Sequence, residues 1–271
     1  MRDPALAVIP ARLASERLHR KPLHPILGRP LIERVWSRVA AMSLFEAVVV
    51  ATDAPEILQH CESVGAACVL TDPAHPSGTD RVAEVAEMPP YRDFQVIANV
   101  QGDEPLVEEE HLSMALELVS RGGAGWDVGT CATPLRSLDA FENPSVVKVA
   151  RAGDGRALYF SRAGIPCRRE GHPTPEDLSR EPYLRHLGIY VYRRQALLTW
   201  VALPPSPLEE LERLEQLRAL EGGIGIGVAV VEGAAPGVDT AEDVARMEEM
   251  LSDVGLDVAG RSNPSNHAKG S

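Results

Sequence analysis

The sequence predicts an α/β fold with a mainly parallel sheet flanked by helices. Short apolar runs typical of buried strands alternate with helical patterns from the N-terminus onward, which is the order of a βαβ chain. No internal repeat interrupts this alternation, and 271 residues are enough for one large domain or for a domain with a sizeable insertion. We expect a single domain over residues 1–256 and a small, polar, disordered tail over residues 257–271.

The composition is ordinary for a globular protein, but the charge balance is acidic. A net charge of −12 argues against a general binder of nucleic acid or anionic membranes, so an anionic ligand must be caught by a local cluster of cations. The four cysteines form no CxxC pair, which favours free thiols in a reducing cytosol over a zinc site. Neither a signal peptide nor an apolar run of roughly 20 residues is found, so we expect a cytoplasmic protein with no membrane insertion.

Apolar periodicity and local breakers place the expected elements in order. Gly65 ends the second helix, Pro89-Pro90 breaks the third, and Thr240 caps the last. From residue 128 the strands become more meandering, and we expect residues 128–222 to form a smaller subregion with a mobile loop over residues 168–182. Strands are expected at residues 5–9, 47–51, 67–70, 94–100, 128–133, 146–150, 158–160, 185–193 and 225–231, and helices at residues 31–42, 54–64, 79–87, 108–120, 208–220 and 241–251.

The stretch between the first strand and the first helix is the most distinctive in the chain. Arg12, Arg17, Arg20 and Lys21 put four cations into ten residues of an otherwise acidic protein. In open α/β sheets ligands bind beyond the carboxyl ends of the strands, where this loop would lie. The loop is therefore either a seat for a polyanion or a solvated basic loop, and the stretch alone favours neither.

Two acidic turns follow strands that we expect to be parallel members of one sheet. Asp103 lies in Gln101-Gly102-Asp103 after a strongly apolar strand, and Asp239 follows the last strand. If both strands are parallel, the two carboxylates meet at the cationic loop, and such a group suits a divalent metal with a polyphosphate. Oxygen ligands without His or Cys favour magnesium over zinc. The simpler interpretation of Asp239, as a residue that merely tightens a turn, is the commoner one.

A second polar loop, of sequence His75-Pro76-Ser77-Gly78-Thr79-Asp80-Arg81, enters the expected third helix. Its hydroxyl and amide groups suit a nucleobase, and Arg81 suits a phosphate. The alternative is that Ser77 or Thr79 only caps the helix, and without other information we prefer it.

Taken together, these stretches resemble a known family. They are similar to the sugar-nucleotide cytidylyltransferases, and within that family to the CMP-Kdo synthetases, which activate 3-deoxy-manno-octulosonate (Kdo). The resemblance covers about residues 5–251, and nine motifs in the same order make it specific. The motifs are Ile9-Pro10-Ala11-Arg12, Ser15-x-Arg17-Leu18 with Lys21-Pro22-Leu23, Ala51-Thr52-Asp53, His75-x-Ser77-Gly78-Thr79-x-Arg81, Asn99-Val100-Gln101-Gly102-Asp103-Glu104-Pro105, Ala157-Leu158-Tyr159-Phe160-Ser161-Arg162, Arg185-His186-Leu187-Gly188-Ile189-Tyr190, Leu214-Glu215-Gln216-Leu217-Arg218 and Gly237-Val238-Asp239-Thr240.

The resemblance implies a Rossmann-like nucleotidyltransferase (GT-A-like) fold and a reaction between CTP and Kdo. In that reaction the sugar 2-hydroxyl attacks the α-phosphate with the help of Mg2+, and CMP-Kdo and pyrophosphate form, for lipopolysaccharide biosynthesis. It also implies a homodimer, with residues 128–222 supplying the sugar side and a dimer contact. Two alternatives stay open: a related ulosonic acid as substrate, such as 8-amino-Kdo or a sialic acid, and a non-catalytic nucleotide-binding protein.

The same resemblance implies roles for individual residues, which fall into phosphate, nucleotide, metal and sugar groups. The triphosphate is held by Ala11, Arg12 and Lys21, and the nucleotide is surrounded by Ser77, Gly78, Thr79, Arg81 and Gln101. The metal ligands are Asp103 and Asp239, which together with Arg12 and Lys21 form the catalytic set. The sugar side consists of Arg17, Gln101, Arg162, His186, Tyr190, Glu215 and Gln216. By their spacing alone, His186 and Tyr190 would equally suit a core strand.

One departure from the family concerns the first loop. The family usually has Leu-Pro-Gly-Lys where this chain has Leu18-His19-Arg20-Lys21. Losing the glycine removes easy access to positive φ, so the loop either never needed it or has changed shape. The Arg20 side chain either adds a cation toward the triphosphate or points into solvent.

Overall fold

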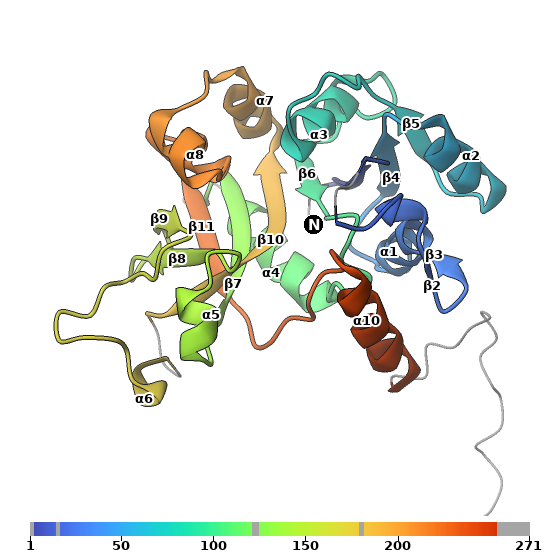
Figure 1. The fold of residues 1–271 in the computed structure, drawn as a ribbon. Coiled ribbons are helices and arrows are strands. Elements are labelled where there is room, and N and C mark those ends of the chain that lie inside the picture. Colours follow the sequence, from blue (N-terminus) through green and yellow to red (C-terminus); the bar gives the residue numbers. More distant parts are fainter. Residues whose placement is uncertain (1–2, 15–16, 121–124, 179–181, 254–271) are drawn as a thin grey trace, which may run out of the picture.

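A computed structural model describes residues 3–14, 17–120, 125–178 and 182–253 (Figure 1). The tail expected over residues 257–271 lies outside these residues. The strands are β1 (Ala5–Ala11), β2 (Pro25–Ile26), β3 (Arg29–Pro30), β4 (Ala47–Thr52), β5 (Cys68–Leu70), β6 (Val96–Asn99), β7 (Val128–Pro134), β8 (Lys148–Arg151), β9 (Ala157–Ser161), β10 (Leu184–Arg193) and β11 (Ile226–Val230). The helices are α1 (Leu31–Ala40), α2 (Pro55–Ser63), α3 (Gly78–Glu87), α4 (Glu109–Ser120), α5 (Leu138–Glu142), α6 (Pro175–Leu178), α7 (Arg194–Ala202), α8 (Pro207–Glu212), α9 (Gln216–Glu221) and α10 (Ala241–Asp253), with one 3-10 turn, η1 (Lys21–Leu23).

The central sheet is mixed but mainly parallel, as predicted. Its strand order is β11-β7-β10-β6-β1-β4-β5. Strands β6, β1, β4 and β5 pair in parallel, and β11 pairs in parallel with β7. Because β10 is antiparallel to both β6 and β7, the β7–β11 pair runs in the same direction as β1 and β6. The carboxyl ends of β1, β6, β7 and β11 therefore meet at one edge of the sheet, which is where ligands of such sheets bind.

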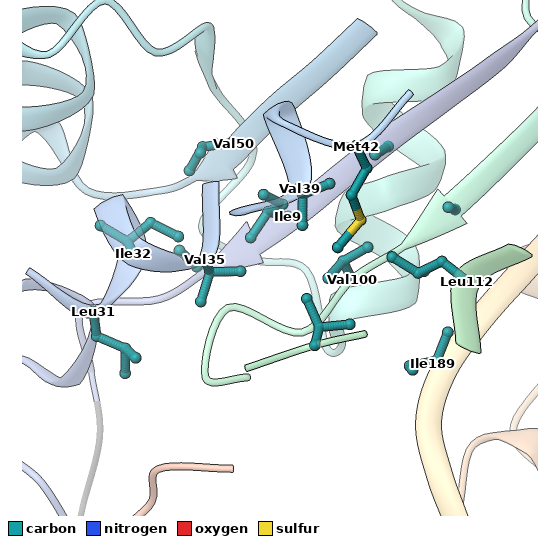
Figure 2. Packing of buried hydrophobic residues seen from close by; sticks show 14 of the residues in the cluster. Ile9, Leu31, Ile32, Val35, Val39, Met42, Val50, Val100, Leu112 and Ile189 are labelled. Carbon is teal, nitrogen blue, oxygen red and sulfur yellow. The ribbon is translucent and has the colours of Figure 1, made fainter. Parts of the chain in front are cut away.

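Helices cover both faces of this sheet, so alternate side chains of a strand enter two different cores. Along β1, Ala7 and Ile9 belong to a cluster with α1, α2, α4 and α10, part of which Figure 2 shows. The intervening Leu6 and Val8 pack in a second cluster with α3, α7 and α9. All four side chains are fully buried, which explains the continuous apolar run of this strand.

The expected smaller subregion lies to one side of the main sheet. Strands β8 and β9 pair off the main path, and with α5 and α6 they extend away from the body of the molecule (Figure 1). A small cluster of Leu135, Phe141, Leu178 and Tyr183 holds this part together. The loop expected over residues 168–182 contains α6, and its residues 179–181 lie outside the described part.

The prediction of a single helix over residues 208–220 is wrong, because the structure has two shorter helices there, α8 and α9. Arg213 stands between the two pieces in the left-handed conformation, with φ 54° and ψ 49°. The carboxylate of Glu212 accepts hydrogen bonds from the Ser161 hydroxyl, at 2.7 Å, and from the Arg162 backbone amide, at 2.9 Å. These bonds fix the end of α8 on β9 and favour a turn there, which apolar periodicity alone does not detect. The sequence also missed α7, the short α5 and α6, and the β2–β3 hairpin.

Gly129 in β7 offers a test of the packing between the sheet and α4. A β-carbon at this position would overlap the backbone carbonyl oxygen of Ala115 in α4. Backbone atoms cannot rotate away, so Gly129→Ala should lower the free energy of unfolding by about 3 kcal/mol. Gly153→Ala is the matched control, because nothing lies within 4 Å of its added carbon. Urea unfolding of both variants measures the difference, and equal stabilities would contradict the close packing.

Candidate active site

Three segments converge at the carboxyl edge of the sheet and enclose a cavity of about 330 Å³. They are the loop after β1, the turn after β6 and the segment that leads from β11 to α10. The lining residues are Pro10, Ala11, Arg12, Ala14, Arg17, Lys21, Pro22, Gln101, Gly102, Asp103 and Asp239. The predicted cationic loop and both predicted acidic turns therefore lie in one site.

Asp239 reaches this cavity in a way that the sequence did not indicate. β11 is the last strand of the sheet, with β7 and β10 between it and β6, so its own end is remote from β6. The residues after Val230 instead cross to the centre of the sheet edge, where the Val238 amide donates to the Asp103 carbonyl at 2.9 Å. Thr240 then caps α10 reciprocally with Asp243. The capping role belongs to Thr240, and the Asp239 carboxylate faces the cavity cations.

Lys21 joins the two carboxylates of the site. Its ammonium nitrogen lies 2.7 Å from Oδ2 of Asp103 and 2.9 Å from Oδ1 of Asp239. Burial alone would lower the pKa of Lys21, but the charges and hydrogen bonds of Asp103 and Asp239 outweigh it, and the pKa is raised. One positive charge therefore balances two carboxylates that would otherwise repel each other.

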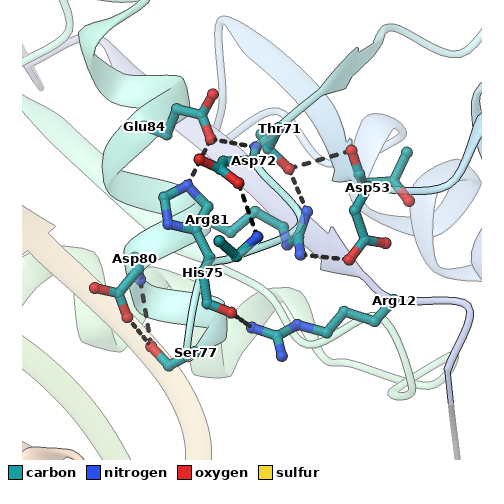
Figure 3. Close-up of polar contacts among 11 residues, drawn as sticks. Arg12, Asp53, Thr71, Asp72, His75, Ser77, Asp80, Arg81 and Glu84 are labelled. Carbon is teal, nitrogen blue, oxygen red and sulfur yellow. Dashed lines mark hydrogen bonds and ion pairs between the residues drawn. The ribbon is translucent and has the colours of Figure 1, made fainter.

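The other cations of the first loop are also engaged by protein groups. A guanidinium nitrogen of Arg17 lies 3.0 Å from Oδ2 of Asp239, and most of the Arg17 side chain is exposed. Arg12 donates to the backbone carbonyl of His75 at 2.6 Å, and this bond joins the first loop to the second (Figure 3). Arg12, Arg17 and Lys21 of the first loop are therefore all paired with neutral or acidic groups of the protein.

Arg20 stands where the resemblance leads us to expect a glycine, and its backbone adopts the left-handed conformation that favours glycine. Its φ is 51° and its ψ is 39°, in the left-handed region. The guanidinium lies 3.7 Å from Glu56 in α2, and both side chains are largely exposed. A non-glycine residue thus adopts a left-handed conformation here at a conformational cost, and the Arg20 side chain is directed to α2.

The second polar loop is tied firmly to the fold (Figure 3). Ser77 caps α3 by accepting from the Thr79 and Asp80 amides, so the structural interpretation of this serine is correct. Arg81 is fully buried, lies 2.9 Å from Oδ2 of Asp53, and also bonds to the Thr71 hydroxyl. The Arg81 guanidinium that suited a phosphate is thus engaged by protein groups.

The neighbouring residues of the second loop contact the end of β1 and the start of α9. Gly78 packs on Pro10 of β1, where an added β-carbon would come within 3.5 Å of the ring. Thr79 donates its hydroxyl to the Glu215 carboxylate at 2.9 Å. Burial raises the pKa of Glu215, against the opposing hydrogen bond from Thr79. Gln216 is buried beside it at the start of α9.

His186 and Tyr190 lie in β10 on either side of a β-bulge. The ring nitrogen Nε2 of His186 lies 3.0 Å from the Thr130 hydroxyl, and burial lowers the pKa of His186 to about 3, with Arg185 adding to the effect. The Tyr190 hydroxyl is buried without a hydrogen-bond partner among the described residues. The bulge exposes the Gly188 carbonyl, which accepts from the Gln101 side chain at 3.3 Å.

Arg162, the remaining residue expected on the sugar side, is held entirely by backbone carbonyls. Its guanidinium donates to the carbonyls of Glu212, Pro144 and Arg213, at 2.7, 3.0 and 3.2 Å. The buried Lys148 in turn donates to the Arg162 carbonyl at 2.6 Å. In this arrangement the Arg162 guanidinium joins β9 to the α8–α9 turn.

Sequence reasoning missed a second cavity, of about 480 Å³, that adjoins the first. Glu104 and Gly237 line it, next to Asp103 and close to Asp239 of the first cavity. Its other charged or polar side chains are those of His111, Ser145, Arg185, His186 and Asp243. Burial raises the pKa of Glu104 to about 7, with the Asp103 charge adding to the effect and Arg185 opposing it. Glu104 and Arg185 stand inside the predicted motifs, but nothing in their spacing indicates that they share a cavity.

The described residues also limit the other kinds of site that the chain offers. Nowhere among them do three or more His, Cys, Asp or Glu side chains gather as a ready metal site. All four cysteines are free, as expected. Within the same part of the chain, every helix is too short or too polar to cross a membrane.

A mainly parallel sheet whose carboxyl edge combines a cationic loop with two carboxylates is typical of enzymes that transfer phosphoryl or nucleotidyl groups. The family model described as "Cytidylyltransferase" matches residues 6–226, and the chain belongs to this family. The 3-deoxy-manno-octulosonate cytidylyltransferase of Gemmatimonas aurantiaca is 50% identical over 90% of this chain and 92% of its own length. That of Yersinia enterocolitica is 44% identical over 91% of this chain and 98% of its own length.

A solved structure agrees with the family assignment. It is described as CMP:2-keto-3-deoxy-manno-octonic acid synthetase complexed with CTP, and it superposes with a TM-score of 0.84 at 35% sequence identity. The similarity covers 93% of this chain and all of that one. The nucleotidyltransferase fold expected from the motifs is therefore confirmed.

Replacing Arg20 by glycine tests the strained first loop. Because the left-handed conformation costs an L-residue about 1–2 kcal/mol and glycine little, Arg20→Gly should raise the free energy of unfolding by up to about 1 kcal/mol once the greater backbone entropy of glycine is subtracted. The Michaelis constant for the nucleotide should change by only a few-fold, on the order of 1 kcal/mol or less. Denaturant unfolding and steady-state kinetics measure the two effects. A loss of turnover by orders of magnitude would contradict the Arg20–Glu56 placement.

The raised pKa of Glu104 gives a pH dependence with a definite sign. Between the ordinary glutamate value and about 7 the native protein binds more protons than the unfolded chain, so stability falls as pH rises through this range. In metal-free protein, Glu104→Gln should remove this fall and leave the variant more stable than the original at pH 8, by on the order of 2 kcal/mol. Thermal unfolding at pH 5 and pH 8 measures the difference. A parallel pH profile for both proteins would contradict the buried carboxyl.

Proposed function

We propose that this chain is a 3-deoxy-manno-octulosonate cytidylyltransferase, which forms CMP-Kdo and pyrophosphate from CTP and Kdo. The observation that carries the proposal is the Asp103–Lys21–Asp239 group at the sheet edge of a chain that is 50% identical to such an enzyme over nearly its whole length. The same similarity supports a cytoplasmic homodimer in lipopolysaccharide biosynthesis, with residues 128–222 as the sugar-side and dimer-forming part of a domain that ends near residue 256.

The triphosphate of CTP would bind in the first cavity. Arg12 and Lys21 are cations of the first loop that line this cavity near the carboxyl end of β1. Ala11 contributes backbone beside them. In a protein of net charge −12, such a local cluster is what an anion requires. Arg12 can exchange its bond to the His75 carbonyl for bonds to phosphate, which are stronger because the acceptor is also charged and the guanidinium can donate two parallel hydrogen bonds.

Magnesium fits the two carboxylates. Asp103 and Asp239 provide hard oxygen ligands, already close enough to share one cation, and Mg2+ commonly takes one or two carboxylates and completes its shell with phosphate and water. Asp103 and Asp239 are therefore the residues that would hold it. When bound, Mg2+ supplies charge neutralisation at the α-phosphate and makes the sugar hydroxyl more acidic.

The nucleoside would lie toward the second loop, between Ser77, Gly78 and Thr79 and the side chain of Gln101. The backbone groups at the start of α3 suit a pyrimidine edge, while Ser77 itself stays occupied as the helix cap. Arg81 would act from behind this surface, because its pair with Asp53 ties α3 to the end of β4. Its contribution to nucleotide binding would thus be to hold the loop in shape.

The sugar acid would lie between the two cavities and β10. Arg17, which is largely exposed beside Asp239, suits the sugar carboxylate, and Glu215, Gln216, His186 and Tyr190 supply groups for the hydroxyls. Arg162 would support this side by holding the α8–α9 turn that presents Glu215.

The reaction needs little covalent chemistry from the protein. The sugar 2-hydroxyl oxygen forms a bond to the α-phosphorus and releases its proton to solvent. The bond between the α-phosphorus and the oxygen that bridges to the β-phosphate breaks, and its electron pair leaves with pyrophosphate. Catalysis by this chain is then mainly positioning of the two substrates and neutralisation of phosphate charge by Arg12 and Lys21.

A pyrophosphate-release assay with CTP, Mg2+ and a panel of Kdo, 8-amino-Kdo and sialic acid tests the proposal. Kdo should give the largest kcat/KM. A larger kcat/KM with another ulosonic acid would identify that acid as the substrate in place of Kdo. Binding of CTP without pyrophosphate release for any of the three acids would favour a nucleotide-binding protein without catalysis.

Asp103→Asn tests the metal carboxylate in the same assay. The variant should fold normally but lose turnover by several orders of magnitude, because removing a group that acts in the transition state lowers kcat. Asp93→Asn is the matched control, since Asp93 is exposed and lies before β6, whereas Asp103 lies after it. Near-normal turnover of Asp103→Asn would remove Asp103 from the proposed metal site.

A further inference from the structure

We propose that the Lys21 ammonium takes the place of the divalent metal in the nucleotide-free protein, so that the metal binds together with the nucleotide and not before it. This inference deepens the proposed function and rests on it for the identity of the nucleotide. It concerns whether the metal can reach Asp103 and Asp239 before the nucleotide binds, and it is argued from the position of Lys21 between them.

The first step is the position of the ammonium. A single nitrogen lies 2.7 Å from one oxygen of Asp103 and 2.9 Å from one oxygen of Asp239, which are the two carboxylates that would hold the metal. A metal ion bonded to the same two oxygens would stand within a few ångströms of that nitrogen. Two such cations repel each other strongly in a partly buried site, and the Lys21 side chain is only 18% exposed. Metal and ammonium therefore exclude each other.

The second step is the state of the remaining carboxylate oxygens. Arg17 lies 3.0 Å from Oδ2 of Asp239, the oxygen that Lys21 does not contact. Both oxygens of Asp239 and one oxygen of Asp103 are thus bound to cations of the same loop. A metal ion that arrives alone must displace Lys21 and Arg17 from these oxygens. The two displaced side chains then have no new anionic partner.

The third step is the effect of the nucleotide. Among the described residues, two carboxylates balance Lys21 and Arg17, and Arg12 adds a further positive charge whose partner there is the His75 carbonyl. A lone divalent ion would increase this positive excess, whereas a metal that arrives with a triphosphate brings more negative than positive charge. Phosphate oxygens are also good partners for the released lysine and arginine side chains. The triphosphate therefore offers Lys21 and Arg17 new anionic partners, and Asp103 and Asp239 become available to the metal.

Removing the lysine should open the metal position without nucleotide. We choose Mn2+ as the probe, because it prefers the same oxygen ligands as Mg2+ and its free concentration is measured directly by electron paramagnetic resonance. Without nucleotide, Lys21→Met should bind Mn2+ about ten-fold or more tightly than the original protein, the factor expected for loss of one well-formed ion pair in competition. Asp103→Asn in the Lys21→Met background should abolish the gain.

Arg20→Met is the matched control. It removes one positive charge from the neighbouring residue of the same loop, but Arg20 is directed at Glu56 and contacts neither carboxylate. Its Mn2+ affinity should stay within about two-fold of the original. A gain as large as that of Lys21→Met would mean that only net charge matters, and the inference would be overturned.

Two further results decide the inference independently of activity. Lys21→Gln repeats the measurement in case the methionine variant does not fold, and circular dichroism checks both variants. Equal Mn2+ affinity of folded Lys21 variants and the original protein would overturn the placeholder role, even if pyrophosphate release with CTP and Kdo succeeds. Tighter Mn2+ binding by the Lys21 variants supports that role, even if no sugar acid is turned over, so the two proposals fail separately.

Discussion

The site depends on bringing two carboxylates together at the edge of one sheet and compensating their charge. Asp103 and Asp239 would repel each other at this separation, and the Lys21 ammonium between them removes that cost. Their positions follow from the parallel direction of the strands around β6 and from the segment that carries the chain back from β11. The first loop has to end in a tight turn at η1 for Lys21 to reach them, and Arg20 accepts a left-handed conformation to allow it.

Close backbone packing holds this edge in place. An added β-carbon on Gly102 would come within 2.8 Å of the Pro10 carbonyl oxygen, so the glycine lets the turn after β6 lie directly against the end of β1. The nearest neighbour of this glycine is therefore another strand of the protein. The Val238 amide completes the contact from the other side by donating to Asp103. The two carboxylates proposed to hold the metal thus stand on two segments that share a backbone hydrogen bond, and one of these segments also packs on the end of β1.

The polar residues around the cavity divide into those that face it and those that hold it. Lys21, Arg17 and Arg12 have side chains whose partners a triphosphate can replace. Arg81 and Arg162 have the same chemistry, but the Arg81 guanidinium is paired with Asp53 and the Arg162 guanidinium donates to backbone carbonyls. Burial and the geometry of the neighbouring turns separate these two groups of cations. The sequence cannot separate them, because the residue type is the same for an arginine that faces the cavity and for one that holds the fold.

Much of this protein is determined by its sequence alone. The alternation of apolar runs and helical patterns predicts the mainly parallel sheet, and the ordered motifs predict the cytidylyltransferase family, because both signals are local in the chain. The tertiary structure decided what depends on distant residues. It divided the helix expected over residues 208–220, directed Arg20 to Glu56, placed Lys21 between Asp103 and Asp239, and joined Glu104 and Arg185 in one cavity. Those contacts arise between segments far apart in the chain, and no periodicity or spacing records them.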